Sequence, residues 1–144
     1  NYGAGKMDRV KKGYRASLIT VGVWGLFITL LFVCFPEQIS GVFFHEPTAI
    51  ATAVGYMIII GYSEAFMSVE LMTVGALSGL GKTHLCSVIS ITLTSARIPL
   101  AIFLSGTALG LLGIWWALTA TSVVKGIVFA MAFYWITARM RNSK

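Results

Sequence analysis

The sequence predicts an all-α, polytopic membrane protein with four membrane-spanning helices. Hydrophobic residues make up 57 % of the 144 positions and charged residues only 11 %, which excludes a disordered chain and fits poorly with a soluble domain. The apolar residues gather in four long runs at helical spacing, and no strand pattern accompanies them. The lipid bilayer is therefore the expected partner. Nucleic acid is excluded despite the formal charge of +6, because the basic residues lie beside apolar spans.

The chain opens with a basic segment, which we expect to be cytoplasmic. Residues 1–15 carry five Lys or Arg against one Asp and lack the apolar run of a signal peptide. Residues 17–35 then give 19 uncharged positions, about 28 Å of helix, which is enough to cross the hydrocarbon core. Pro36 ends this first span. Residues 37–46 have apolar positions at helical spacing between charged ends, which predicts a short helix lying along the membrane interface.

Three further spans follow. Residues 51–80 form the second, which at near 30 residues is long enough to tilt or bend within the bilayer. Residues 85–104 form the third and residues 111–138 the fourth. Residues 105–110 between them are too few to be more than a turn. We treat residues 1–144 as one helical bundle, and the absence of an initiator Met predicts that it is part of a longer protein.

The loop charges predict the orientation of this bundle. Lys and Arg accumulate on the cytoplasmic side of membrane proteins. The amino-terminal segment, the Lys82 turn and the carboxyl-terminal tail carry nine of them, whereas the other two loops carry none. We therefore expect both termini to be cytoplasmic and the protein to be a multi-pass component of the inner (plasma) membrane. The tail cations are Arg139, Arg141 and Lys144.

Four ionisable side chains lie inside the predicted spans: Glu64, Glu70, Arg97 and Lys125. A charge near the bilayer centre costs roughly 2.5–3.5 kcal/mol, so each of these side chains indicates a function. The alternative is that a neighbouring charge neutralises it and that it only holds helices together. Counting from the cytoplasmic helix ends puts Glu64, Arg97 and Lys125 at depths of roughly 20–24 Å, and Glu70 about two turns nearer the cytoplasm. We therefore expect Glu64 to pair with Arg97, and Glu70 to be unpaired and neutral at rest, as a proton-coupling group requires.

Hydroxyl side chains share helix faces with these charges. Three of them lie within about 80° of Arg97 on the third span, and Ser63 shares a face with Glu70 on the second. Such a face either lines a polar cavity or bonds to its own or a neighbouring helix. The three on the third span are Ser87, Ser90 and Thr94. The candidate residues of an ion-coupling or substrate cavity are Ser63, Glu64, Glu70, Thr94, Arg97 and Lys125.

Other motifs predict no catalytic or cofactor site. The Gly-Lys-Thr sequence that ends at Thr83 is not a phosphate loop, since position 76 is Ala and no strand precedes it. Gly75 and Gly79 instead form a GxxxG pattern that predicts a close helix approach.

The two histidines and the two cysteines are each split between opposite membrane faces, so we expect no zinc site and no disulfide. No serine or cysteine has a histidine at suitable depth, so we expect no enzyme. The residues concerned are His45, His84, Cys34 and Cys86.

Four short motifs together resemble the multidrug and toxic compound extrusion (MATE) transporter family. They occur in family order at residues 1–6 (NYGAGK, with Arg9), 75–83 (GALSGLGKT), 97–100 (RIPL) and 109–115 (LGLLGIW). The resemblance implies a twelve-helix fold of two lobes, of which this chain matches the last four helices of the second. Its partners would then be the missing amino-terminal lobe and the first two helices of its own lobe.

The resemblance implies a secondary active antiporter that exports organic cations, drugs or metabolites by alternating access, with Na⁺ or H⁺ as the coupling ion and no other cofactor. Many members place an acidic residue at the position that is Met67 here. Glu64 and Glu70, one turn to either side, are the candidates to replace it. Two alternatives stay open: a lipid or polysaccharide flippase of the same superfamily, and a small four-helix scaffold without transport activity.

Overall fold

The computed structural model describes residues 1–142, which form six helices. Three of these helices are long and apolar enough to cross a membrane, and the bent pair α3–α4 makes a fourth candidate if the two helices are counted as one span. No strand occurs within the described residues. The prediction of an all-α, polytopic membrane protein is therefore confirmed, with three or four candidate spans among the described residues. The helices are α1 (Met7–Cys34), α2 (Pro36–Phe43), α3 (Pro47–Gly61), α4 (Glu64–Gly79), α5 (Thr83–Ser105) and α6 (Leu111–Asn142).

Several helices extend beyond the predicted spans, among them α1 and α6. Helix α1 begins at Met7, so much of the basic segment continues the first span as helix, with Asp8 in its first turn near the positive end of the helix dipole. Helix α6 continues four residues past position 138. Of the predicted cytoplasmic cations, Lys144 lies outside the described residues.

The predicted second span is two helices and not one. Helices α3 and α4 meet at an angle of 56° across Tyr62 and Ser63. The Ser63 amide donates to the Ile60 carbonyl at 2.8 Å, a tight turn that shifts the hydrogen bond away from the α-helical partner. Glycine and serine close together are a common cause of a sharp kink, and Gly61 ends α3 here.

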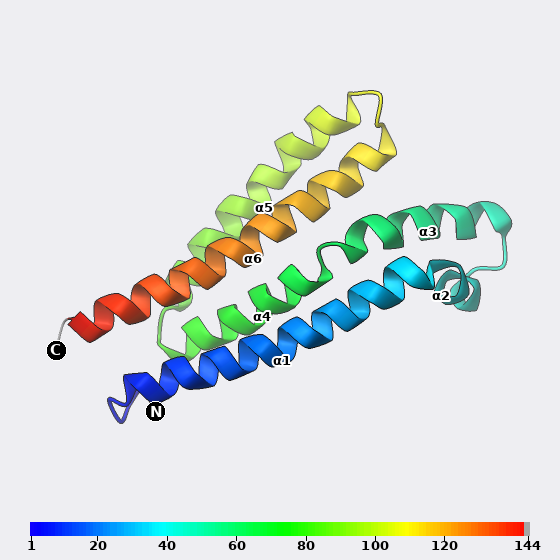
Figure 1. Ribbon diagram of the computed structural model, residues 1–144. Helices are drawn as coiled ribbons and strands as arrows, with labels where there is room; N and C mark the ends of the chain where they lie inside the picture. The colour runs from blue at the N-terminus through cyan, green and yellow to red at the C-terminus, as the bar shows by residue number, and fades with distance from the viewer. Residues whose placement is uncertain (143–144) are drawn as a thin grey trace.

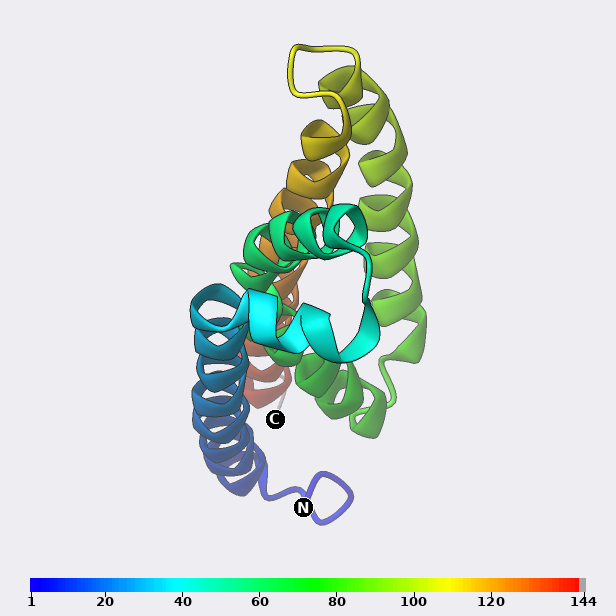
Figure 2. The same ribbon diagram turned by 90° about the vertical axis from the view of Figure 1, so that its right-hand side faces the viewer.

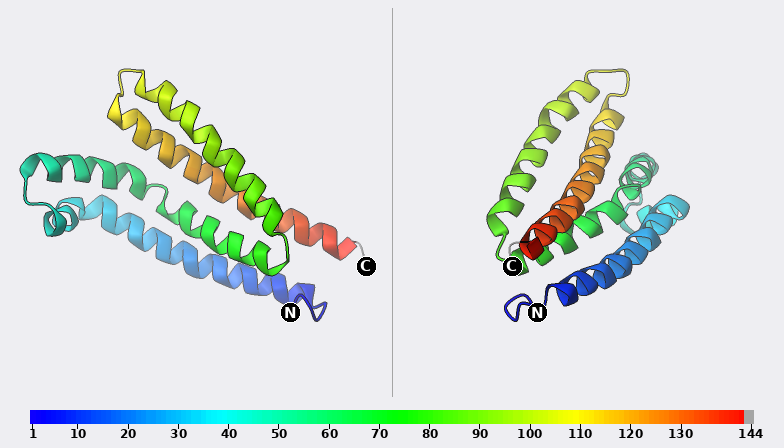
Figure 3. Two further views of the ribbon diagram at one scale, coloured as in Figure 1. Left: turned by 180° about the vertical axis from the view of Figure 1, so that it is seen from behind. Right: turned by 60° about the vertical axis from the view of Figure 1, so that its left-hand side comes forward.

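The helices make two pairs that converge at one end (Figure 1). Helix α4 packs between α1 and α6, and α5 packs along α6. Both chain ends and the turn that holds Lys82 lie at the converging end, whereas the other two loops lie at the opposite end, where the pairs diverge (Figure 3). Helix α2 runs across the end of α1 at this diverging end (Figure 2). That orientation suits the predicted interfacial helix, although its position in a membrane stays a prediction and residues 44–46 lie outside the helix.

The buried core lies at the converging end. Tyr14 of α1 stacks on Phe133 of α6 with ring centroids 3.6 Å apart, and its hydroxyl bonds to that of Thr73 of α4 at 2.8 Å. The core therefore ties three helices together at one point. Its members are Tyr14, Leu77, Leu80, Cys86, Phe129, Phe133 and Ile136.

Glycines allow close helix contacts, but not those that the GxxxG pattern predicted. A Cβ added at Gly25 would meet the Ala65 backbone at 2.6 Å, and one at Gly126 would meet the Phe66 carbonyl oxygen at 2.7 Å. At Gly75 and Gly79 an added Cβ would meet nothing within 4 Å among the described residues. No described helix makes the predicted approach to that pair, because their face is not the one that α4 turns to α1 and α6.

Candidate functional site

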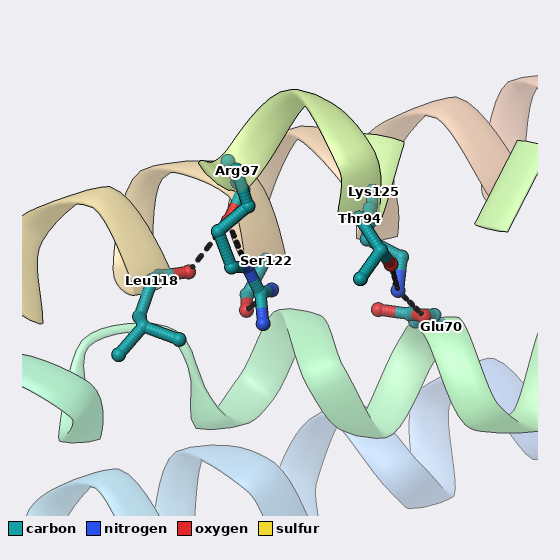
Figure 4. Close-up of polar contacts among 7 residues, drawn as sticks. Glu70, Thr94, Arg97, Leu118, Ser122 and Lys125 are labelled. Carbon is teal, nitrogen blue, oxygen red and sulfur yellow. Dashed lines mark hydrogen bonds and ion pairs between the residues drawn. The ribbon is translucent and has the colours of Figure 1, made fainter. Parts of the chain in front are cut away.

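Glu70 and Lys125 form an ion pair between α4 and α6. The Lys125 Nζ lies 2.6 Å from Glu70 Oε1, and the two side chains are only 11 % and 13 % exposed. Lys125 Nζ also donates to Thr94 Oγ1 of α5 at 3.4 Å, so three helices contribute to this contact (Figure 4). The expectation that Glu70 is unpaired is therefore wrong. The depth estimate located helix axes, whereas a long lysine side chain reaches a partner at another level.

Arg97 of α5 bonds to α6 through neutral groups. Its Nε donates to Thr121 Oγ1 at 2.7 Å, and its Nη2 donates to Ser122 Oγ at 3.2 Å. The Thr121 hydroxyl oxygen in turn lies 2.7 Å from the carbonyl oxygen of Ala117 and 3.0 Å from that of Leu118. Its single hydrogen is within reach of both, which fixes the hydroxyl oxygen as the acceptor for Arg97. The guanidinium is thus held in place without a carboxylate among the described residues.

A cavity of about 310 Å³ brings these charges together. Both halves of the broken span contribute to its wall, Tyr56 and Ile60 from α3 and Met67, Glu70 and Leu71 from α4. The opposite wall comes from α5 and α6. Its lining there is Arg97, Leu118, Ser122 and Lys125. Three of the six candidate residues, Glu70, Arg97 and Lys125, therefore line one cavity, with Thr94 bonded to its lysine.

The remaining two candidates lie elsewhere. Glu64 is half-buried in the first turn of α4, does not line this cavity and forms no ion pair with any described residue. The predicted pairing of Glu64 with Arg97 is wrong, because α4 packs against α1 and α6 and only slightly against α5. Ser63 is fully buried, and its hydroxyl donates to the Ile60 carbonyl at 2.8 Å, so it belongs to the helix break and not to the cavity wall.

Hydroxyl groups satisfy the backbone at the break beside this cavity. Thr29 of α1 donates to the Gly61 carbonyl at 2.8 Å, and Thr119 of α6 donates to the Ile59 carbonyl at 2.9 Å. Together with Ser63, they provide a donor for each of the last three carbonyl groups of α3. Broken helices persist inside membranes only where such partners replace the lost helical bonds.

The sequence model of the MatE family matches residues 1–103, about seven-tenths of the chain. The chain belongs to the MatE family. Its members are membrane efflux transporters, so the chain belongs to a family of multi-pass membrane transport proteins and not to an enzyme family. None of the curated proteins matches the chain. The described residues contain no cluster of three or more His, Cys, Asp or Glu suited to a metal ion.

The matched region of this MatE chain includes Glu70, Thr94 and Arg97, whereas Lys125 lies beyond it. Sequence reasoning missed the partners of Arg97 on α6, although one signal pointed to them. Three hydroxyl residues precede Lys125 within two turns of an otherwise apolar helix: Thr119, Thr121 and Ser122. Tyr56 carried no such signal, since an aromatic residue is ordinary in a membrane span.

Proposed function

We propose that this MatE chain is part of a cation-coupled antiporter that exports small organic molecules by alternating access. The observation that carries the proposal is the Glu70–Lys125 ion pair, which joins two spans inside a cavity. A proton or Na⁺ that binds the Glu70 carboxylate competes with Lys125 for it. Ion binding therefore releases the contact between α4 and α6, and ion release restores it, which couples the ion to the relative position of the helices.

Two further observations support Glu70 as the coupling group. Met67, at the position where many MATE members have an acid, lines the same cavity as Glu70, whereas Glu64 does not. The cavity also spans the break between α3 and α4, and discontinuous helices commonly form the binding sites of secondary transporters. Both observations favour Glu70 as the replacement for the family's acidic residue.

We further propose that the chain forms the last four helices of the second lobe of a two-lobe transporter in the inner (plasma) membrane, with both termini cytoplasmic. The other lobe and two preceding helices then complete the substrate path. The grouping of the termini and Lys82 at one end of the bundle supports this orientation (Figure 1).

The test is transport by the complete protein in proteoliposomes under an imposed pH or Na⁺ gradient. Ethidium and 1-naphthoate serve as cationic and anionic probes. Glu70→Gln keeps the volume of the side chain and mimics its protonated form, so we expect it to fold but to lose gradient-driven export of whichever probe the wild type exports. Glu70→Asp should retain part of the activity.

The matched control is Glu37→Gln, which removes an exposed carboxylate on α2, far along the chain from the cavity. It should export at the wild-type rate. If Glu70→Gln also exports at that rate, Glu70 is structural, and Glu64 becomes the remaining acidic candidate in these spans.

A further inference from the structure

The cavity that holds Glu70 has one more positive than negative charge. Glu70, Lys125 and Arg97 are the three charged side chains in its lining, with a formal sum of +1. The Glu70 carboxylate is paired with Lys125, whose Nζ lies 2.6 Å from Glu70 Oε1. Arg97 therefore has only the neutral hydroxyls of Thr121 and Ser122 as partners within the described residues. An unneutralised cation in a membrane span is costly, so an anion bound there is stabilised.

The Arg97 guanidinium also has N–H donors, beyond those bonded to Thr121 and Ser122, that can bind a second group. It has five N–H donors, of which the bonds to Thr121 and Ser122 use two. Arg97 lines the cavity, so its other donors are available to a molecule within it. A guanidinium that is already held in place loses little freedom on binding, and its planar fork matches the two oxygens of a carboxylate.

A second, apolar cavity adjoins the first. Tyr56 and Ile60 line both cavities, and the second has a volume of about 750 Å³. No charged side chain lines it, and Trp115 packs edge-on against Tyr56 where the two cavities meet. Its other lining residues come from α1, α3 and the segment after α2, and include Phe32, Phe44, Ala53 and Met57. Cavities of this size hold small organic molecules.

We propose that the two cavities together bind an amphipathic organic anion. Its carboxylate, or a comparable anionic group, lies at Arg97, and its apolar body lies beside Tyr56 and Trp115. This inference names the substrate class of the proposed transporter and so rests on that proposal. The net positive charge of the cavity that holds Arg97 favours the anionic group. The apolar cavity, which no charged side chain lines, favours the apolar body.

The first test uses the complete wild-type protein and a matched pair of probes. 1-Naphthoate and 1-naphthylmethylammonium have the same apolar ring system and opposite charges. We expect 1-naphthoate to bind at least about tenfold more tightly and to raise the thermal unfolding temperature, because only the anion pairs with Arg97. Equal binding, or tighter binding of the ammonium, overturns the proposal.

The second test uses variants. Arg97→Gln should weaken 1-naphthoate binding about tenfold or more, Arg97→Lys should give an intermediate loss, and the exposed control Arg15→Gln should change nothing. Ala53→Trp narrows the apolar cavity and should weaken 1-naphthoate but not acetate. If Arg97→Gln does not fold, the lysine variant and the wild-type comparison decide. An unchanged affinity in a folded Arg97 variant overturns the proposal.

The source of the anion is read from nanodiscs made with and without phosphatidylglycerol. Unchanged 1-naphthoate binding assigns the cavity to a free organic anion, whereas competition by the lipid assigns it to an anionic lipid headgroup; both outcomes support an anion site.

Gradient-driven ethidium export without any 1-naphthoate binding overturns the anion site and leaves the antiporter standing. If 1-naphthoate binds but no gradient drives its export, the anion site stands and the antiporter proposal is overturned.

Discussion

Glu70 and Lys125 neutralise each other where either charge alone would be expensive. Both side chains are nearly buried, and the lysine has one further partner, Thr94. Removing one member of a buried pair leaves the other charge without compensation, at a cost of about 3–5 kcal/mol. The pair is therefore a stabilising contact between α4 and α6 as well as the proposed coupling group.

This dual role predicts non-additive effects on stability. Glu70→Gln and Lys125→Gln should each lower the thermal unfolding temperature of the complete protein in detergent, and the double variant should recover part of the loss. The control is Glu64→Gln combined with Lys125→Gln, which should be additive, since Glu64 forms no ion pair with a described residue. Strict additivity for Glu70 and Lys125 would contradict the contact.

The sequence identified most members of the site but not their pairing. Glu70, Thr94, Arg97 and Lys125 were identified because polar residues are rare in apolar spans. Which of them meet depends on the rotation of each helix about its axis and on which helices are neighbours. The predicted pair of Glu64 and Arg97 requires α4 to pack beside α5, its successor in sequence, whereas α4 packs against α1 and α6. The partners of Arg97 and Glu70 follow from that packing.

At the scale of the elements, the break between α3 and α4 positions the cavity. The length of the predicted second span allowed for a bend, and Gly61 and Ser63 are the local residues that favour one. The donors that stabilise it, Thr29 and Thr119, come from two other helices, 32 and 60 positions away in sequence from the carbonyls that they contact. No local pattern identifies such distant partners.

The break should therefore depend on these two hydroxyls. Thr29→Val and Thr119→Val keep the side-chain shape and remove one donor each. We expect each to destabilise the protein by about 0.6–1.7 kcal/mol, the range found for hydrogen bonds between membrane helices, measured as a lowered unfolding temperature. Thr20→Val is the control, because its hydroxyl bonds to Ala16 of its own helix and is exposed. An equal loss for all three variants would mean that the two interhelical hydrogen bonds contribute no more to stability than a hydrogen bond within one helix.

At the scale of the whole molecule, the charges agree with the arrangement of the loops. The cationic turn at Lys82 and the basic segment at the start of α1 lie at one end, and the loops without Lys or Arg lie at the other (Figure 1). The helical character of the spans and the grouping of their ends followed from the sequence. The divergence of the helix pairs did not, since it arises from the location of the buried aromatic side chains.

The orientation in the membrane is tested by labelling single cysteines in a background that lacks Cys34 and Cys86. An impermeant thiol reagent applied to intact cells should label position 45 and leave position 82 unlabelled until the membrane is opened, because Lys and Arg favour the cytoplasmic side. Labelling at position 82 from outside would reverse the proposed orientation.

The core lies at one end of the bundle, so the helix pairs are joined there, at the stacked rings of Tyr14 and Phe133. The start of α3, the end of α5 and the start of α6 lie at the opposite end, where the pairs are apart (Figure 3). Lys125 lies eight residues from Phe133, about 12 Å along α6, whereas Leu111 lies twenty-two residues away, about 33 Å. A rotation of about 10° at the stacked rings therefore displaces the start of α6 by about 6 Å and the ion pair by about 2 Å. Such a rotation would change the apolar cavity, which Trp115 of α6 lines, more than it would change the distance between Glu70 and Lys125.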